Sequence, residues 1–292
     1  MQRAAEQTAL YCLWYKKKNK HMHNLHIAVI GAGQMGSGIA AVFAAHGYRV
    51  TLVDAVQRAL TSAKDRITAY LSKVSVESDM ISFHSDLNVL ATADIVIEAI
   101  PENLDLKHSL YTKLNTIVRS DTMIATNTSS FPISDLAKSV ANPERFIGIH
   151  FMNPVLKMDL VEIIPGSLTN EHTLATGKTL ITTIKKTAVI STDRPGFIVN
   201  RLLIPMINQA FMALEEGLAS KEDIDTAMEK GAAFPMGPLK LADFIGLDTC
   251  LAIMETLCDA FPNDGYTPSS LLKTYVNQGT LGRKTKQGVY SY

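Results

Sequence analysis

The chain has 292 residues, of which 47% are hydrophobic and 19% are charged, and its 28 lysines and arginines balance 28 aspartates and glutamates. This length allows one large domain or two of ordinary size. The neutral charge balance favours no nucleic-acid partner, and no apolar run reaches the roughly 18 residues of a membrane span. The cysteines Cys12, Cys250 and Cys258 form no CxxC pair. They indicate structural thiols in a reducing compartment, and we expect a cytoplasmic protein.

The first residues fit neither a secretory signal nor a mitochondrial presequence. A short apolar patch over residues 9–15 is followed by lysines, whereas a secretory signal places its positive charge first. Glu6 and the single Arg3 argue against a mitochondrial presequence. We expect residues 1–24 to be a mobile extension, with Met22 as an alternative start.

A glycine-rich turn opens the first folded segment. Residues 26–31 predict a buried strand that leads into Gly31-Ala-Gly-Gln-Met-Gly36, and a helix over 35–46 and a strand over 48–53 follow, with Asp54 at the end. Strand, glycine turn, helix, strand and acid in this order indicate a Rossmann-type dinucleotide-binding unit. A glycine turn in another α/β protein, such as a methyltransferase, is the alternative.

Each residue of this pattern has a physical role. Gly31 allows the tight turn, Gly33 allows the backbone to approach a pyrophosphate, and Gly36 allows the helix to pack closely on the strand. The helix N-terminus attracts the diphosphate. Asp54 would accept hydrogen bonds from the ribose hydroxyls and repel a 2′-phosphate, which favours NAD over NADP.

The pattern of strands and helices continues to residue 190. Further strands are predicted over 82–85, 93–100, 122–126, 146–151, 160–164 and 187–190, with helices over 57–76, 104–118, 131–136 and 174–184. We therefore expect an α/β fold with a mostly parallel sheet. Such sheets bind ligands beyond the carboxyl ends of their strands, so the segments at Gly31, Asp54, Glu102, Ser129 and His150 should line one rim.

One histidine and one glutamate stand out in the apolar strands. His150 lies near the end of the run over 146–151, and Glu162 lies inside the run over 160–164. A carboxylate among apolar residues loses hydration and needs a partner. If the two strands are neighbours, the imidazole can supply it. The alternatives are a histidine that is merely satisfied in the core or at the surface, and a glutamate that faces solvent.

No strand pattern follows residue 190. Helices are predicted over 193–217, from Ser220 to 231, over 237–261 and over 269–277. The sequence therefore predicts a boundary near Thr192, with a Rossmann-type NAD-binding domain at 25–192 and an all-α domain at 193–292. Asn200 is a polar residue in the apolar start of this second domain, and it could reach the cleft.

Long motifs in a fixed order resemble one family. They read G-A-G-Q-M-G-S-G-I-A (31–40), I-E-A-I-P-E-N (97–103), T-N-T-S-S (126–130), G-I-H-F-M-N-P (148–154), L-V-E (160–162), D-R-P-G-F-I-V-N-R (193–201), G-P-L-K-L-A-D-F-I-G-L-D (237–248) and L-G-R-K-T-K-Q-G-V-Y (281–290). From about Ile27 to Tyr292 the chain resembles the short-chain L-3-hydroxyacyl-CoA dehydrogenases.

The resemblance implies NAD-dependent interconversion of an L-3-hydroxyacyl-CoA, most simply 3-hydroxybutyryl-CoA, and its 3-ketoacyl-CoA. It implies a catalytic pair of His150 and Glu162, in which an imidazole with an ordinary pKa of about 6.5 exchanges the hydroxyl proton. It also implies a homodimer, in which the helical domain at 193–292 serves as the substrate and dimerisation domain. The implied substrate contacts are Ser129 and Asn200, and the implied cofactor contacts are Gly31, Gly33, Gln34, Met35, Gly36, Asp54, Glu102, Lys107, Ser129 and Asn153.

The chain departs from the family pattern in one place. Residues 55–93 are too few for the helical hairpin with which the family helps to hold CoA, although Lys64 and Lys73 supply cations there. The same His–Glu pair acting on a substrate without CoA, such as L-gulonate or carnitine, is therefore one alternative. A non-catalytic NAD(H)-binding protein is another. No metal, nucleic acid or membrane is expected as a partner.

Overall fold

The structure is a computed structural model that describes residues 22, 24–262 and 265–292. Apart from Met22 and Asn24, the predicted extension over residues 1–24 lies outside the described residues. The chain divides into two compact units, one ending at Asp193 and the other comprising Arg194–Tyr292. We describe each unit by itself.

The first unit is built on an eight-stranded sheet in the order β3-β2-β1-β4-β5-β6-β7-β8. All neighbouring strands are parallel except β6 and β7, so the predicted, mostly parallel sheet is confirmed. The strands are β1 (His26–Ile30), β2 (Arg49–Val53), β3 (Ile81–His84), β4 (Ile95–Glu98), β5 (Met123–Thr126), β6 (Phe146–Phe151), β7 (Leu160–Pro165) and β8 (Thr187–Ile190).

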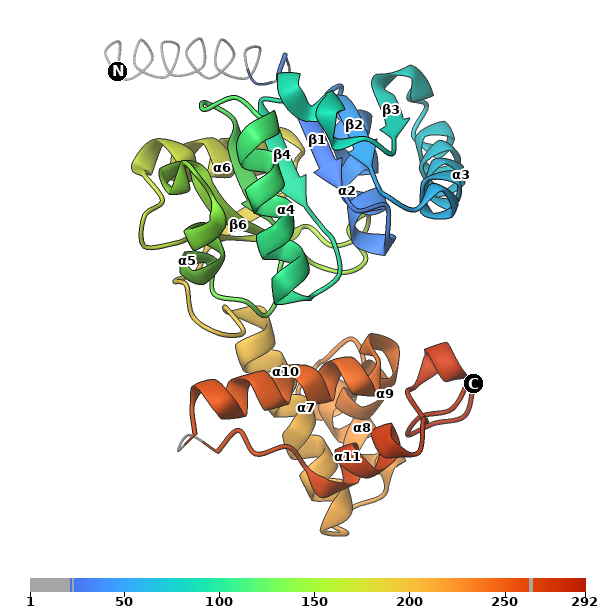
Figure 1. The fold of residues 1–292 in the computed structure, drawn as a ribbon. Helices are drawn as coiled ribbons and strands as arrows, with labels where there is room; N and C mark the ends of the chain where they lie inside the picture. Colours follow the sequence, from blue (N-terminus) through green and yellow to red (C-terminus); the bar gives the residue numbers. More distant parts are fainter. Residues whose placement is uncertain (1–21, 23, 263–264) are drawn as a thin grey trace, which may run out of the picture. The chain divides into compact units, whose positions relative to one another are not determined.

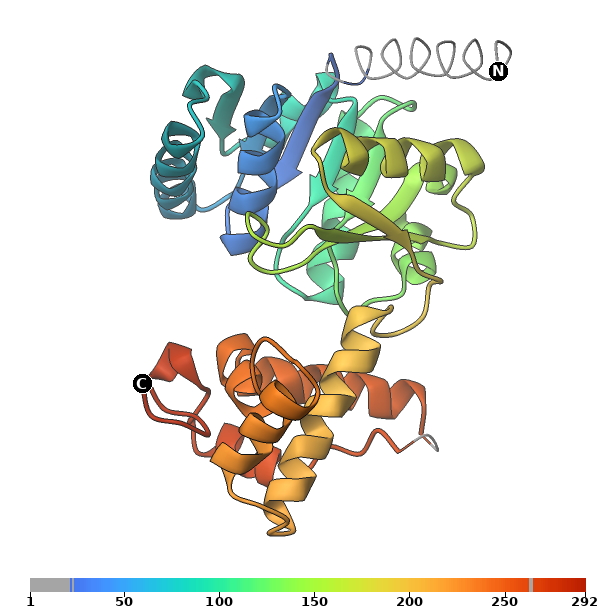
Figure 2. The same cartoon turned by 180° about the vertical axis from the view of Figure 1, so that it is seen from behind.

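Helices cover both faces of this sheet. They are α2 (Gln34–Ala45), α3 (Gln57–Lys73), α4 (Leu104–Ile117), α5 (Ile133–Leu136) and α6 (Glu171–Thr183). Figure 1 shows α4 in front of the strands, and Figure 2 shows α2 and α6 against the opposite face. Buried residues of α2, α3 and α6 share one apolar core with the strands. The sheet is therefore covered on both sides, as the continuous apolar strands require.

The two faces of β6 have different neighbours. Ile147 and Ile149 enter the core shared with α6, whereas Phe146 meets the Tyr111 ring of α4 at 5.1 Å between centroids. A Cβ on Gly148 would contact Ile133 of α5 at 2.8 Å. Because successive side chains of a strand point to opposite faces, His150 shares the face of α4 and α5.

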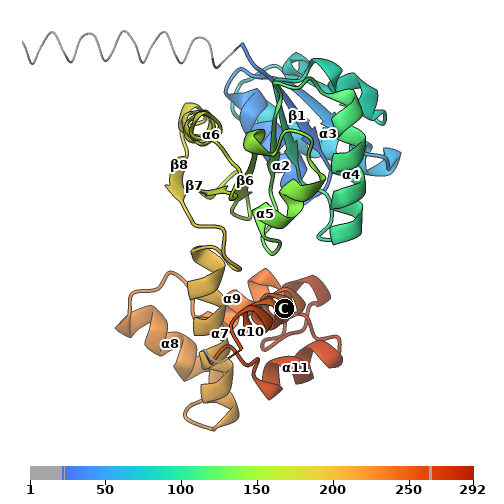
Figure 3. The same cartoon turned by 60° about the vertical axis from the view of Figure 1, so that its left-hand side comes forward.

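The second unit is helical throughout its described elements (Figure 3). Its helices are α7 (Val199–Glu215), α8 (Lys221–Gly231), α9 (Pro238–Ile245), α10 (Leu247–Ala260) and α11 (Ser270–Asn277). The apolar face of α7 lies in the core of this unit, where Ile207 and Phe211 are fully buried. The predicted N-cap is confirmed, because the Ser220 hydroxyl accepts a hydrogen bond from Asp223 N at 3.1 Å.

Two helix predictions in this half are wrong. The helix predicted over 237–261 is two helices, because Gly246 lies between them with a φ of +107° that interrupts the helix. The helix predicted from Asp193 begins at Val199 instead. The Asp193 carboxylate accepts hydrogen bonds from Ile133 N and Ser134 N, at 2.7 and 2.8 Å, at the start of α5. Within the described residues, no helix is both long enough and apolar enough to cross a bilayer.

Candidate active site

The glycine turn between β1 and α2 has the form that a dinucleotide requires. Gly31 has a φ of +106°, and a Cβ there would clash with the carbonyl of Ala99. A Cβ on Gly36 would clash with the carbonyl of Gly31. A Cβ on Gly33 would meet nothing within 4 Å, so the space above this residue is open. Two glycines therefore serve packing, and the third leaves room for a close backbone approach.

The N-terminus of α2 is suited to an anion. No side chain caps it, and its first turn holds no acidic residue. Gln34 is exposed and Met35 is partly exposed at this end. The unsatisfied N–H groups and the helix dipole favour a negative ligand, so the turn fits the diphosphate of NAD.

Arg66 of α3 adds a cation beside this turn. Its guanidinium donates to the carbonyl of Ala32 at 3.1 Å and to the hydroxyl of Ser37 at 2.9 Å. This residue was not predicted from the sequence. Its distance of 34 positions from Ala32 gives no local signal, and the contact depends on α3 packing beside α2.

Asp54 lies directly after β2 and braces the glycine turn. Its carboxylate accepts hydrogen bonds from Ala32 N at 2.7 Å and from Val56 N at 2.8 Å. The residue is partly exposed, and carboxylate oxygens have about four lone-pair sites in total. The side chain can therefore hold the turn and still accept a ribose hydroxyl.

His150 and Glu162 face each other across the antiparallel strands β6 and β7. They are direct register partners, and His150 Nδ1 lies 2.7 Å from Glu162 Oε2. His150 is 7% exposed and Glu162 is fully buried. The predicted contact is thus present, and the alternative of a solvent-facing glutamate is excluded. The antiparallel turn of the chain after β6 is what brings a buried acid opposite the imidazole.

The segment after β5 is held next to the end of β6. The Asn127 side chain accepts a hydrogen bond from Phe151 N at 2.9 Å. Glu102, which follows β4, accepts hydrogen bonds from Ser129 N at 2.6 Å and from the Thr128 hydroxyl at 2.9 Å. Glu102 and Ser129, both predicted as cofactor contacts, therefore contact each other.

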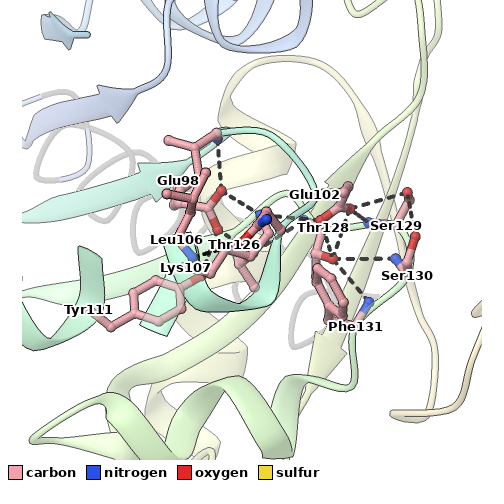
Figure 4. A network of polar contacts seen from close by, with 12 residues as sticks. Glu98, Glu102, Leu106, Lys107, Tyr111, Thr126, Thr128, Ser129, Ser130 and Phe131 are labelled. Atoms are coloured by element: carbon pink, nitrogen blue, oxygen red, sulfur yellow. Dashed lines mark hydrogen bonds and ion pairs between the residues drawn. The ribbon is translucent and has the colours of Figure 1, made fainter. Parts of the chain in front are cut away.

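Glu98, at the end of β4, is fully buried, and Figure 4 shows it next to Lys107 and Thr126. Its carboxylate accepts hydrogen bonds from Lys107 Nζ at 2.7 Å, Tyr111 OH at 2.6 Å, Thr126 Oγ1 at 2.8 Å and Ile100 N at 2.8 Å. Lys107, predicted as a cofactor contact, is only 1% exposed, and its Nζ also lies 3.3 Å from Glu102 Oε2. Burial, followed by the charge of Glu98, raises the pKa of Tyr111 well above its usual value.

Asn153 is joined to the glycine turn from the loop after β6. Its Oδ1 accepts a hydrogen bond from Gln34 Nε2 at 2.9 Å. The carbonyls of Val155 and Met158, which lie farther along this loop, accept hydrogen bonds from Lys186 Nζ at 2.8 and 2.6 Å. Both predicted cofactor contacts, Gln34 and Asn153, are exposed. The predicted residues of the first unit thus lie at or next to the carboxyl-end rim of the sheet, and the side chains of Lys107, His150 and Glu162 among them are buried.

Asn200 is the second residue of α7 and is partly exposed. It belongs to the second unit, so its part in the site stays a prediction. Another asparagine of the same helix, Asn208, was not predicted from the sequence. Asn208 is 1% exposed, accepts from Ser269 N at 2.8 Å and donates to the carbonyl of Thr267 at 3.0 Å, which ties the start of α11 to α7.

Comparison with known proteins places the whole described chain in one family. Residues 26–194 match the 3-hydroxyacyl-CoA dehydrogenase NAD-binding domain, and residues 196–292 match the C-terminal domain of the same family. A "Probable 3-hydroxybutyryl-CoA dehydrogenase" of Deinococcus radiodurans is 44% identical over 278 residues, which cover 92% of this chain and 100% of that protein. The mitochondrial hydroxyacyl-coenzyme A dehydrogenase of Rattus norvegicus is 40% identical and covers 91% of each chain.

A solved structure gives the same result. The (S)-3-hydroxybutyryl-CoA dehydrogenase PaaH1 of Ralstonia eutropha matches with a TM-score of 0.88 and 41% identity, over 92% of this chain and 99% of that chain. Both domains of the family are therefore present in their order, and the first contains a glycine turn and an acid that fit NAD. The chain belongs to the 3-hydroxyacyl-CoA dehydrogenase family, a family of NAD-dependent oxidoreductases.

Proposed function

We propose that the chain interconverts L-3-hydroxybutyryl-CoA and acetoacetyl-CoA, with His150 as the residue that exchanges the hydroxyl proton. The observation that carries this proposal is the 2.7 Å contact between His150 Nδ1 and the fully buried Glu162 carboxylate. An imidazole held in this way has a fixed orientation, and its other nitrogen points away from the acid. This is the arrangement that a general base or acid requires.

His150 and Glu162 have different roles in the proposed reaction. In the oxidative direction, His150 takes the proton from the 3-hydroxyl group, and in reverse it returns that proton. Glu162 holds the ring and stabilises its cationic form. Charges about 4 Å apart at an effective dielectric constant of about 20 attract by about 4 kcal/mol before desolvation. NAD, when bound, supplies the acceptor for the hydride that leaves C3.

Two neutral side chains complete the proposed substrate contacts. The hydroxyl of Ser129 lies in the segment after β5, and Asn200 lies at the start of α7. Each can donate a hydrogen bond to the substrate oxygen as its charge changes between hydroxyl and ketone. Donors placed where charge develops stabilise the transition state more than the ground state.

The short acyl-CoA substrate is supported by the printed names of the similar proteins, which include 3-hydroxybutyryl-CoA dehydrogenases at 44% and 41% identity. A substrate without CoA is favoured by one structural observation. Helix α3 ends at Lys73 and strand β3 begins at Ile81, and only the short 3-10 helix Ser78–Met80 lies between them, so no second α-helix follows α3 in this segment. The place where the family holds CoA is therefore reduced to one helix.

Two further expectations belong to this proposal. We propose a homodimer formed through the helical unit, in which Leu202 of α7, an apolar side chain that is 70% exposed, is an interface residue. We also keep the expectation of a cytoplasmic enzyme, for which the free cysteines Cys250 and Cys258 are the supporting observation.

The test is an NADH-oxidation assay with a panel of ketones. The proposal predicts rapid oxidation with acetoacetyl-CoA, slower oxidation with longer 3-ketoacyl-CoAs, and none with acetoacetate or other free acids. Turnover with free acids but not with thioesters would reject CoA recognition and favour the alternative substrate. Binding of NADH without turnover of any ketone or alcohol would favour a non-catalytic protein.

A further inference from the structure

Glu98 is a buried acid whose partners satisfy it fully. It is 0% exposed, and both of its carboxylate oxygens accept two hydrogen bonds each. Oε1 binds Lys107 Nζ and Ile100 N, while Oε2 binds Tyr111 OH and Thr126 Oγ1. Four donors around one carboxylate fix its position, because any rotation would leave a buried polar group unpaired.

Lys107 connects the buried Glu98 to Glu102 at the rim of the sheet. Its Nζ lies 2.7 Å from Glu98 Oε1 and 3.3 Å from Glu102 Oε2, and its side chain is 1% exposed. A buried ammonium needs anionic partners, and here it has one deep partner and one at the rim. Glu102, with 36% of its side chain exposed, is the only member of this trio of charged groups that solvent reaches.

Glu102 in turn holds the segment that carries Ser129. It accepts from Ser129 N at 2.6 Å, from Ser129 Oγ at 3.3 Å and from Thr128 Oγ1 at 2.9 Å. A continuous path of charged or charge-assisted contacts thus runs from Glu98 through Lys107 and Glu102 to Ser129 (Figure 4). Glu98 itself lies at the buried end and reaches no solvent.

The path lies at the ends of β4 and β5, in one half of the dinucleotide fold. The first half, with the glycine turn and Asp54 at the ends of β1 and β2, receives the adenosine. The second half, which begins with β4, receives the nicotinamide nucleotide by the same rule. The Glu98 path therefore ends at the reactive half of the cofactor.

We propose that Glu98 is a positioning residue for the nicotinamide half of the cofactor site and acts through Lys107 on the orientation of Glu102. This inference rests on the proposed function, in which Glu102 and Ser129 contact the cofactor. The competing account is that Glu98 only satisfies a buried lysine and stabilises the packing of α4 on the sheet. The two accounts differ in one measurable quantity, the affinity for NADH.

A double-mutant cycle on NADH affinity separates them. Glu98→Gln keeps the shape of the side chain and removes its charge, so Lys107 shifts its remaining attraction to Glu102 and draws that carboxylate away from Ser129 N. We expect the Kd for NADH, measured by fluorescence titration, to rise about tenfold, as for the weakening of one charge-assisted hydrogen bond. We expect Glu102→Gln to raise it at least as much. The double variant should bind no more weakly than Glu102→Gln alone, because the two residues act on one path.

The control is a second acid at the other end of the same strand. Asp94 precedes β4 and pairs with Arg119 at 2.7 Å, at the edge of the sheet away from the cofactor. Asp94→Asn should lower the melting temperature and leave the Kd for NADH unchanged. Should Glu98→Gln not fold, Glu98→Asp enters the same cycle, because it keeps the charge and withdraws the carboxylate from Lys107 by one methylene group.

Three results would overturn the proposal. If Glu98→Gln lowers the melting temperature as Asp94→Asn does and leaves NADH affinity intact, its role is structural. If the effects of Glu98→Gln and Glu102→Gln on Kd multiply, Glu98 does not act through Glu102. If Glu102→Gln leaves the Kd unchanged while acetoacetyl-CoA is still reduced, Glu102 is no cofactor contact, and the positioning role fails without the dehydrogenase function.

Discussion

Single residues decide the chemistry, and the residue that the account depends on most is Glu162. It has no exposure to solvent, and His150 Nδ1 is 2.7 Å from its carboxylate. This acid could be predicted from the sequence because it interrupts an apolar strand. A carboxylate in such a place is costly unless a partner meets it.

The same reasoning applies to Glu98, which ends the apolar strand β4, yet this residue was not predicted from the sequence. The difference lies in the partner. The imidazole of His150 follows from two neighbouring strands, whereas Lys107 reaches Glu98 only because α4 folds back over the sheet. A contact that depends on how a helix packs cannot be read from the spacing of residues alone.

Glu162→Gln tests the role of the carboxylate. The amide keeps the size of the side chain but removes the charge that stabilises a cationic imidazole, so we expect kcat with acetoacetyl-CoA to fall by about 10² to 10⁴. The Kd for NADH should stay within twofold of the unchanged protein. The measurement is steady-state NADH oxidation beside a fluorescence titration. A kcat within a factor of three of the original would remove Glu162 from the mechanism.

Whole elements set the frame of the site, and β1, the glycine turn and α2 are the clearest case. Strand and helix bounds in this unit follow the predicted ranges within a few residues. Apolar runs, glycines and the acid at the strand end are local signals. The split between α9 and α10 was missed because a single glycine inside an apolar pattern does not reveal its φ, which is +107° at Gly246.

Two glycine substitutions in the turn should separate folding from binding. Gly33→Ala places its Cβ in open space, so we expect an unchanged melting temperature and a Kd for NADH raised at least about tenfold, because the diphosphate approaches the backbone there. Gly36→Ala drives its Cβ into the carbonyl of Gly31, so we expect a loss of about 1–3 kcal/mol in the free energy of unfolding. Thermal unfolding and NADH titration measure both. If the two variants had the same melting temperature and the same Kd for NADH, the separate roles of Gly33 in binding and Gly36 in packing would be contradicted.

Strand β1 also carries a pH-dependent contribution to stability. His26 is 4% exposed and its Nε2 lies 2.8 Å from Thr51 Oγ1. Burial, and then the charge of Arg49, lower the pKa of His26 below 6.5. Below pH about 6.5 the imidazole of His26 is therefore protonated in the unfolded chain and still neutral in the folded chain. The free energy of unfolding consequently decreases as the pH falls from about 6.5 toward the pKa of His26 in the folded chain.

His26→Gln tests this sign. We expect the variant to be less stable than the original at pH 8, because packing and the contact with Thr51 are impaired. The difference in the free energy of unfolding should shrink at pH 5.5, since the variant has no proton to take up at this position. Urea unfolding at both pH values measures it, with the exposed His172→Gln as the control. A difference that grows on acidification would contradict the lowered pKa.

At the scale of the whole molecule, the chain combines an NAD-binding unit and a helical unit, each with its own apolar core. The change from alternating strands and helices to helices alone allowed this division to be predicted. The surface of the proposed dimer could not be predicted in the same way, because the sequence pattern does not distinguish an exposed apolar residue on a helix from one that faces the core. Leu202 is such a residue, with 70% exposure.

The proposed dimer predicts a change of mass on substitution of this residue. Light scattering after size-exclusion chromatography should show a dimer for the unchanged protein and a shift toward monomer for Leu202→Glu, because the charge would have to be buried in the interface. Leu168→Glu, at a 60% exposed leucine of the first unit, should leave the mass unchanged. A monomeric unchanged protein would contradict the dimer.

The central claim is that His150 exchanges the substrate proton, and turnover by His150→Gln is its most direct test. The account predicts that kcat for acetoacetyl-CoA reduction falls by about 10² to 10⁴ while the Kd for NADH is unchanged, because the imidazole acts on the proton and not on the nucleotide. His172→Gln, at an exposed position of α6, should retain full activity. Turnover by His150→Gln at a near-normal rate would contradict the claim.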